Sequence, residues 1–482
     1  MLKPSGVVAV LFGTLIMSYA VAWGEEPVRK DLERTVEALK MRLRDQERRI
    51  AELEDAQSEQ IRREDIRKLV DEAVGDVGPN DFRLYWDHGM RAKTGDGRLK
   101  MKFGGRLYYD WAWIDGNDIE SDFAASGTDF ENLEDGKEVR RARLYWQGEW
   151  NKKIKFKWQY DWADSPVVKD LYLELKQLPV VGNLRMGHFK EPFSLEELTS
   201  SKYITFIERG SPNVFTPGRS AGFMLHDSIL GDRVTWAAGL FQDTSDDPSA
   251  DQYDDAQALR DGDEQFTMRL TGLPYYAEEG ARLIHTGFGY SYRSREHNLR
   301  FRQRPEAHLS PRFVNTGRLG MIDHENRLGA EMAAVFGPFH ISGEYMTSLV
   351  QMSSDVNQDD PCFDGWYVQV GYFLTGEHRP YKKSAGSFTR VKPKSNWDEG
   401  GAGAWEIAGR YSQLDLTDSG INGGVMENYT LGLNWHLNQN VRMMWNYIHT
   451  QVEDVGGLGV PVVWRGIDDD ADLLLMRLQV DF

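Results

Sequence analysis

The stretch "LKMKFGGRLYYDWAW", residues 99–113, alternates between two kinds of side chain. The odd positions are apolar and end in a run of aromatic residues, whereas the even positions carry three basic residues, Lys100, Lys102 and Arg106. A period of two predicts a β-strand with one apolar and one polar face. The period alone does not separate a protein core from a lipid bilayer as the partner of the apolar face.

The same pattern recurs from about residue 90 to the C-terminus, in segments of about ten residues that are aromatic at their ends, as a transmembrane β-barrel requires. The 15 Trp and 20 Tyr of the chain lie mostly in these segments. We therefore predict an all-β fold over residues 91–482, a transmembrane antiparallel β-barrel of about 16 strands. The segments are 99–113, 139–150, 154–162, 170–176, 184–190, 233–241, 283–293, 328–336, 338–346, 365–375, 404–414, 428–437, 440–449 and 473–482.

The two ends of the chain favour lipid over core. Residues 1–22 read as a signal peptide, with Lys3, an apolar run and the small residues Ala20-Val21-Ala22 at a cleavage site. The last strand alternates up to a terminal Phe482, which resembles the signal that the barrel assembly machinery of outer membranes reads. We expect a multi-pass barrel in the outer membrane of a Gram-negative-type bacterium, with that machinery and outer-membrane lipid as partners.

Residues 23–75 have a different period. Apolar residues recur at spacings of three and four among many charges, which predicts a short periplasmic coiled coil and therefore self-association; these residues are Val36, Leu39, Leu43, Ile50 and Leu53. A lone solvated helix is the alternative. Gly78 and Pro79 break the pattern, so residues 76–90 read as a linker.

Composition excludes several other classes. Cys362 is the only cysteine, so no internal disulfide forms in the monomer, and the formal net charge of −18 argues against nucleic acid as a partner. No nucleophile, zinc or nucleotide motif occurs, and we expect no enzyme activity, no cofactor and no metal site. The acidic stretches 115–136 and 243–264 read as solvated loops, or as sites where divalent cations bridge to lipopolysaccharide.

Several motifs in sequence order resemble one family, the phosphate-selective porins O and P. They are "FGGRL" at 103–107, "RRAR" at 140–143, "GHFKEPFSLEELTSSKYITFIERG" at 187–210, "RPEAH" at 304–308, "LGAEMAAVFGPFHISGEY" at 328–345, "YFLTGEHRPY" at 372–381, "GAWEIAGRYS" at 403–412 and "LGLNWHLNQN" at 431–440. The resemblance implies a homotrimer of barrels of about 16 strands, each with a loop near residues 190–220 folded inward to narrow the pore.

The resemblance also nominates residues that line the pore and bind anions. Asp170 matches an acidic constriction residue that orients basic neighbours, and Ser200 in the inward loop is expected to donate a hydrogen bond. Simple alternation puts Arg140 on the apolar face, so its role requires a bulge or a subunit interface. The basic candidates are Arg106, Arg141, Arg209, Lys102, Arg140, Arg143, Lys190, Arg302 and Arg304.

Two departures from the family pattern bear on selectivity. Glu197 stands in the inward loop where the phosphate-selective members carry a lysine. Lys190 and Arg143 are basic where close members have uncharged or acidic residues, so the basic character is rearranged rather than lost. The resemblance therefore implies a general anion preference more directly than phosphate selectivity.

Three functions follow as hypotheses. The first is an outer-membrane porin with a water-filled, anion-preferring channel for passive uptake of small solutes, with phosphate and polyphosphate as candidates. The second is a barrel whose coiled coil tethers the outer membrane to the cell wall. The third is a soluble β-rich protein that binds or hydrolyses carbohydrate, which the terminal strand and the lipid-sized alternation disfavour.

Overall fold

The computed structural model describes residues 81–87, 89–116, 133–163, 166–242, 264–294, 299–355, 359–453 and 469–482, together with Glu37 and Met41. The chain divides into two compact units, Met1–Gly78 and Pro79–Phe482. The expected signal peptide and coiled coil lie outside the described residues, except that Glu37 and Met41 are helical. The acidic stretches 115–136 and 243–264 also fall mostly outside them.

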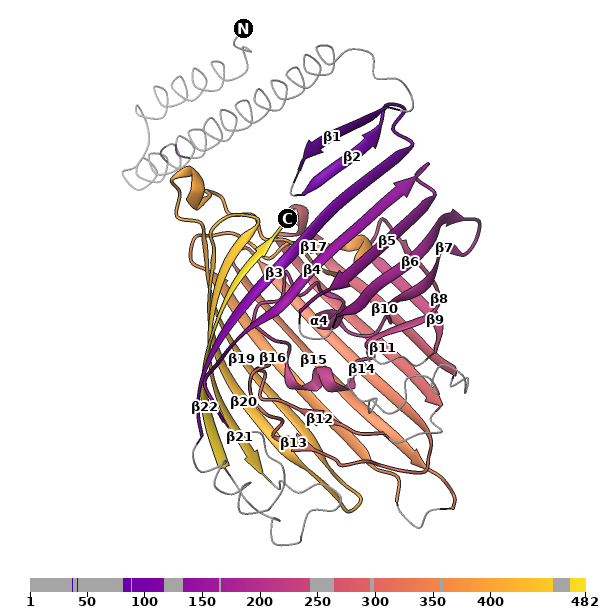
Figure 1. Ribbon diagram of the computed structural model, residues 1–482, viewed down its shortest axis with the longest axis vertical. Helices are drawn as coiled ribbons and strands as arrows, with labels where there is room; N and C mark the ends of the chain where they lie inside the picture. The colour runs from indigo at the N-terminus through magenta and orange to yellow at the C-terminus, as the bar shows by residue number, and fades with distance from the viewer. Residues whose placement is uncertain are drawn as a thin grey trace, which may run out of the picture. The chain divides into compact units, whose positions relative to one another are not determined.

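The second unit is a closed β-barrel (Figure 1). Eighteen strands form one antiparallel sheet, and sixteen of them close into a ring because the last strand pairs with the first barrel strand, Leu474 opposite Trp113. The prediction of a barrel of about sixteen strands is therefore confirmed. The barrel strands are β3 (Leu99–Asp115), β4 (Gly136–Trp150), β5 (Ile154–Asp161), β6 (Val167–Leu178), β7 (Gly182–Lys190), β8 (Arg219–Ile229), β9 (Val234–Gln242), β10 (Glu264–Ala277), β11 (Arg282–Ser294), β14 (Ile322–Phe336), β15 (Phe339–Met352), β16 (Cys362–Phe373), β19 (Ala404–Asp418), β20 (Ile421–His436), β21 (Val441–Glu453) and β22 (Asp469–Asp481).

The remaining two strands of the sheet, β1 (Phe82–Trp86) and β2 (Met90–Thr94), form a hairpin. β2 pairs with the first residues of β3, Lys93 opposite Lys100, so the hairpin extends the sheet at the end of the barrel that carries the C-terminus. The linker expected over residues 76–90 therefore contains a strand, β1, in its described part.

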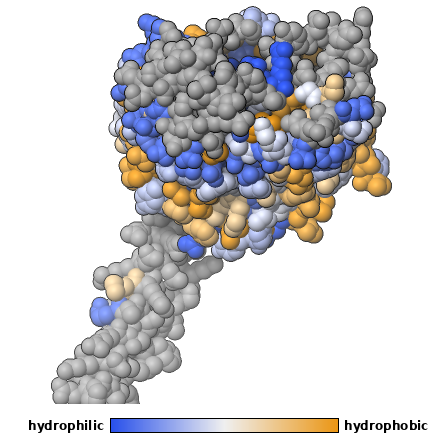
Figure 2. Space-filling model, turned by 90° about the horizontal axis from the view of Figure 1, so that it is seen from below, coloured by the Kyte–Doolittle hydropathy of each residue, from blue (hydrophilic) through white to orange (hydrophobic). Residues whose placement is uncertain are grey.

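Strand β3 shows why the chain forms a barrel. Leu107 and Trp113 face outward and are 50% and 44% exposed, whereas Tyr108 and Ala112 face the lumen and are buried. Because successive side chains of a strand point to opposite faces, one strand supplies both the apolar outer surface and the inner wall. In Figure 2 hydrophobic residues gather along the flank of the barrel, and hydrophilic residues gather around its rim.

Three connections fold into the lumen. From the end opposite the C-terminus come residues 191–218, with α4 (Leu195–Leu198) and η1 (Ser211–Phe215), and the connection described from 299 to 321, with β12 (Arg302–Gln303) and β13 (Val314–Asn315). From the C-terminal end comes the exit segment, residues 374–403, with β17 (Tyr381–Lys382), η3 (Lys383–Ala385), β18 (Ser387–Phe388) and η4 (Trp397–Glu399). The turn between β10 and β11 holds η2 (Glu278–Gly280).

The inserted connections are packed against one half of the wall. The rings of Phe215 and Phe301 lie 5.0 Å apart between centroids, and Phe301 lies 5.7 Å from Phe363 of β16. These residues belong to a buried apolar cluster that continues onto β19–β22 through Leu414, Met426 and Ile448. The lumen is therefore filled on the side of β14–β22, which leaves its open space on the side of β3–β8.

None of the helices in the described part of the chain is long and apolar enough to cross a membrane. Within the same residues, no group of three or more His, Cys, Asp or Glu side chains is arranged to hold a metal ion.

Candidate functional site

A cavity of about 270 Å³ lies between the inserted connection 191–218 and the inner wall formed by β3–β8. We call it the basic cavity. Eight of its lining residues are basic and two are acidic, Asp170 and Glu197. The basic residues are Arg106, Arg141, Arg143, Lys157, Arg185, Lys190, Arg209 and Arg219.

Arg106 on β3 is the clearest case, among the described residues, of a cationic side chain in the basic cavity that has no carboxylate partner. Its Nη1 donates a hydrogen bond to Ser201 Oγ at 2.7 Å, and its Nε has no hydrogen-bond partner although the residue is only 8% exposed. Within the described residues, no carboxylate comes within 4 Å of its guanidinium. A charged side chain held in place by a neutral hydroxyl keeps its charge available to an anion.

Arg141 on β4 is the second such group. Its closest carboxylate, Glu208, lies 3.9 Å away, and its Nε has no hydrogen-bond partner. The guanidinium lies 5.7 Å from the ring centroid of Tyr108 on the neighbouring strand. Arg141 therefore faces the cavity as a buried cation with only one distant counter-charge.

The neighbouring Arg140 faces inward because of a β-bulge. Tyr108 of β3 pairs with Arg141 and Tyr109 pairs with Val139, so Arg140 is the extra residue between two pairs. Its Nε donates to Glu208 at 2.9 Å. The bulge is the feature that its role in the pore requires, but Arg140 does not line the basic cavity.

Glu208 fastens the inserted connection 191–218 to the wall. Besides Arg140 it binds Arg477 of β22, with 2.7 Å between Oε1 and Nη2. Arg477 also pairs with Asp110 at 2.6 Å and donates to the carbonyl of Ile207 at 2.6 Å. These cations hold the pKa of the Glu208 carboxyl well below its usual range against the opposing effect of burial. Arg140 and Arg477 are therefore structural cross-links.

Glu197 does not present a free negative charge. Its carboxylate lies 2.5 Å from Lys190 Nζ and 3.1 Å from Arg209 Nε. Burial alone would raise the pKa of this carboxyl, but Arg209 and Lys190 outweigh burial and lower it to about 2. Arg209 also donates to the carbonyls of Glu196, Glu197 and Thr199 around α4. Glu197 and Lys190, which both depart from the family pattern, therefore form an ion pair in which the negative charge of Glu197 is neutralised.

Asp170 on β6 orients two cations, as its motif position implies. Its carboxylate accepts from Lys157 Nζ at 2.5 Å and from Arg219 Nε at 3.0 Å. Arg143 is paired in the same way, because its Nε donates to Asp161 at 2.5 Å. These cations contribute to the field of the basic cavity but are partly neutralised.

The other predicted residues lie elsewhere or act differently. Ser200 lines the cavity, but the hydroxyl that accepts from Arg106 belongs to the next residue, Ser201. Lys102 faces the C-terminal end, 5.7 Å from the ring centroid of Tyr145. Arg302 and Arg304 are half-buried in the connection 299–321 and do not line the basic cavity.

Three basic lining residues were missed, namely Lys157, Arg185 and Arg219. Lys157 alternates with Trp158 on β5, so the period-two pattern contains the signal that finds it. Arg185 lies on β7 and pairs with Glu174 at 2.6 Å. Arg219 is the first residue of β8, directly after the inserted connection. At this position the alternation of apolar and polar residues does not indicate which face of the strand the side chain occupies.

Glu344 on β15 positions the helix of the inserted connection. Its carboxylate accepts from the backbone N–H groups of Leu195 and Glu196 at 3.0 and 2.8 Å and from the Tyr367 hydroxyl at 2.7 Å. Two helix N–H groups that would lack partners in the lumen are thereby satisfied. This places α4 and with it the Glu197–Arg209 unit.

The chain is similar to a known protein family and to individual known proteins. The phosphate-selective porin O and P family matches residues 98–482. Porin O of Pseudomonas aeruginosa is 26% identical over 435 residues, which cover 82% of this chain and 91% of that protein. An uncharacterized protein of Caulobacter vibrioides is 29% identical over 377 residues, which cover 76% of this chain and 71% of that protein.

The solved structures whose backbones resemble this one have low sequence identity to this chain. OmpT of Vibrio cholerae has a TM-score of 0.47 at 10% identity, covering 80% of this chain and 98% of that chain. The outer-membrane channel DcaP of Acinetobacter baumannii has a TM-score of 0.44 at 10% identity, covering 80% of this chain and 97% of that chain. With the family match spanning the whole barrel, the chain belongs to the phosphate-selective porin O and P family and is an outer-membrane β-barrel porin.

Proposed function

We propose that the barrel is a passive, anion-preferring channel for small solutes, with phosphate and polyphosphate as candidate substrates. The observation that carries the proposal is that Arg106 and Arg141 are buried in the wall of the basic cavity without a close carboxylate partner. A cation without a counter-ion in a low-dielectric wall attracts an anion more strongly than the same cation in water.

The residue type suits oxyanions. A guanidinium stays charged at every physiological pH and offers two parallel donors to a phosphate or carboxylate group. Conduction also requires several sites of moderate strength, so that an anion leaves as readily as it arrives. Paired cations next to the open ones, such as Arg143, Arg219 and Lys157, supply this graded field.

Phosphate selectivity as such is a separate proposal. Glu197 replaces the lysine of phosphate-selective members, but Lys190 and Arg209 neutralise it. The basic cavity therefore keeps an excess of positive charge while the inserted connection contributes none from position 197. We propose that the channel accepts anions broadly and does not discriminate strongly in favour of phosphate.

Assembly and location beyond the barrel complete the proposal. We propose a homotrimer, inserted by the barrel assembly machinery through the Phe482 strand, with a cleaved signal peptide at 1–22 and a coiled coil at 23–75 in the periplasm. We propose no catalytic role and no cofactor. The tethering alternative rests on residues 23–75, of which the structure describes only Glu37 and Met41.

Planar-bilayer recordings of the full-length protein test the proposal. Addition of phosphate should block chloride current, because both anions use the basic cavity, and pyrophosphate should block at lower concentration because it carries more charge. Arg106→Gln should weaken both blocks. A chloride current that neither phosphate nor pyrophosphate reduces would contradict the proposal.

A further inference from the structure

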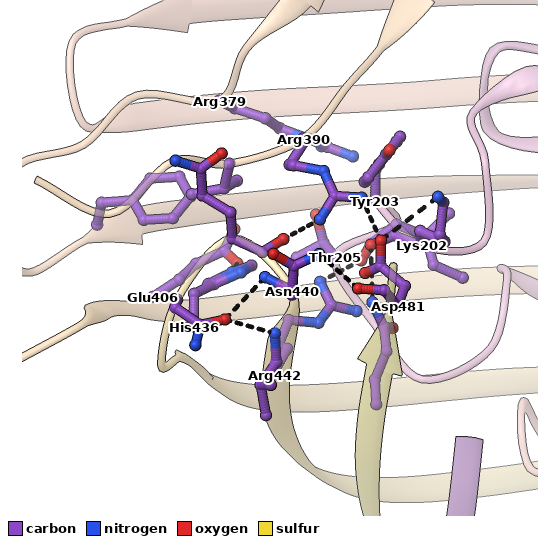
Figure 3. Close-up of a pocket in the computed structure, with 17 residues that line it drawn as sticks. Lys202, Tyr203, Thr205, Arg379, Arg390, Glu406, His436, Asn440, Arg442 and Asp481 are labelled. Atoms are coloured by element: carbon purple, nitrogen blue, oxygen red, sulfur yellow. Dashed lines mark hydrogen bonds and ion pairs between the residues drawn. The ribbon is translucent and has the colours of Figure 1, made fainter. Parts of the chain in front are cut away.

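A second cluster of basic side chains lies at the C-terminal end of the lumen and shares no lining residue with the basic cavity. The exit segment 374–403 meets β20–β22 here around a small cavity of about 20 Å³. We call it the exit cavity. In Figure 3 Arg379 and Arg390 reach it from the exit segment, and Arg442 of β21 reaches it from the opposite side.

Both carboxylates that line the exit cavity are already engaged. Asp481 pairs with Arg390 and lies 3.4 Å from Lys202 Nζ. Glu406 binds His340 Nε2 at 2.7 Å and accepts from Asn434 Nδ2 at 2.9 Å. Its charge acts on Arg379 and Arg442, but from beyond the distance of a salt bridge within the described residues.

Arg379 and Arg442 remain without a direct counter-charge. Both are 4% exposed, and Nη1 of Arg379 and Nε of Arg442 have no hydrogen-bond partner. Among the described residues, neither guanidinium has a carboxylate within 4 Å. Arg442 donates to the carbonyl of Ile204 at 2.9 Å, and Arg379 lies 3.8 Å from the ring centroid of Phe388.

Two buried guanidiniums in one small cavity require a counter-charge. An unpaired buried charge is costly, and buried charges in proteins are paired or bind an ion. A cavity of this size accommodates a particle close to a water molecule in size. A halide fits this description, whereas phosphate, with five heavy atoms, is too large.

We propose that the exit cavity binds one halide-sized monovalent anion, chloride under physiological conditions, between Arg379 and Arg442. The bound anion links the exit segment to β21 and thereby holds this segment inside the lumen. The site is separate from the basic cavity, and the inference does not depend on which anions the channel conducts.

Anomalous diffraction from crystals of the full protein grown in sodium bromide tests the site directly. We expect a bromide peak between Arg379 and Arg442 in the wild type and its loss in Arg379→Gln. The control Arg282→Gln changes an exposed arginine paired with Glu278 on a turn, and it should keep the peak. No peak in wild-type crystals, or a peak that persists in Arg379→Gln, would overturn the proposal.

Thermal unfolding in detergent gives a second, independent readout. At equal ionic strength the wild type should unfold roughly 2–4 °C higher in sodium chloride than in sodium gluconate, because a ligand of the folded state stabilises it. The difference should vanish in Arg379→Gln and persist in the control Arg282→Gln, which changes an exposed arginine on a turn. An equal difference in all three proteins would assign the effect to general salt action and contradict the proposal.

Discussion

Two regions of the lumen contain buried arginines that differ in their partners. On β10, β14 and β19, each of Arg269, Arg327 and Arg410 lies against a carboxylate, namely Glu331 at 2.5 Å, Glu325 at 2.6 Å and Glu306. On the side of β3 and β4, Arg106 meets a hydroxyl and Arg141 meets its carboxylate only at 3.9 Å.

The difference shows that position on an inward face does not define function. A buried arginine with a carboxylate partner is a cross-link, whose removal leaves an uncompensated charge. A buried arginine with a neutral partner is a binding group, because a mobile anion neutralises its charge when it binds. The predictions below separate these two kinds of arginine.

The largest effect should follow from removing a cross-link. In Arg410→Ala the buried Glu306 carboxylate loses its cation, and breaking such a pair costs about 3–5 kcal/mol. The urea midpoint for loss of the heat-modifiable folded band on gels should fall markedly. Arg282→Ala, at an exposed pair with Glu278, should change the free energy of unfolding by less than about 1 kcal/mol. Equal stability of the two variants would break the comparison.

A binding arginine should affect conduction instead of stability. Arg106→Gln and Arg141→Gln each remove a charged donor worth about 1.5–3 kcal/mol, so the concentration of phosphate that half-blocks chloride current should rise about tenfold or more. Their urea midpoints should stay close to wild type.

Arg302→Gln serves as the control for this pair, because Arg302 is basic and half-buried but lies outside the basic cavity. Its half-blocking concentration should match wild type. A loss of block in Arg302→Gln equal to that in Arg106→Gln would mean that the connection 299–321 contributes to the binding site.

The sequence predicted the barrel and much of the basic cavity. Alternation along β3 identifies Arg106 as an inward residue, and the family resemblance identifies Arg141, Asp170 and Glu197. Both signals are local, because they depend on the face of one strand or on one motif.

Partners could not be predicted, because they are set by contacts across the lumen. Arg410 and Glu306 are 104 residues apart, and Arg477 and Glu208 are 269 residues apart. The bulge at Arg140 is also invisible to alternation, since one extra residue reverses the face of all that follows. Whether an inward arginine is a cross-link or a binding group therefore depends on the fold.

Glu197 offers an intermediate case. Glu197→Gln leaves Lys190 and Arg209 without their counter-charge, so we expect about threefold tighter phosphate block.

The pH dependence of the wild type gives a second prediction for Glu197. Because the pKa of the folded Glu197 carboxyl, about 2, lies below the usual value, the stability gained from its ion pairs is present above pH 4.5 and lost only as pH falls through 2. Wild-type phosphate block should accordingly be constant between pH 4 and 6, and a marked rise in block as the pH falls from 6 to 4 would show that Glu197 is titrating.

The smallest effect concerns Lys202 in the inserted connection, beside the exit cavity. Burial lowers its pKa to about 7, although Asp481 opposes this shift. Because the ammonium form exists below the pKa, chloride conductance should fall by less than about twofold as pH rises from 6 to 8. The other charged or titratable groups around it are Lys102, Arg106, Tyr145, Tyr203 and Arg390.

Lys202→Met tests the assignment, because this variant removes the ammonium group and keeps the length of the side chain. Its chloride conductance should be independent of pH between 6 and 8. An unchanged pH dependence in Lys202→Met would assign the titration to another group.

The central claim is that unpartnered arginines of the basic cavity make the channel prefer anions. The reversal potential of the full-length protein in a bilayer under a tenfold potassium chloride gradient measures this preference most directly. The account predicts a potential with the sign of chloride selectivity, shifted toward zero by Arg106→Gln and further by Arg106→Gln combined with Arg141→Gln. A wild-type potential with the sign of potassium selectivity would contradict it.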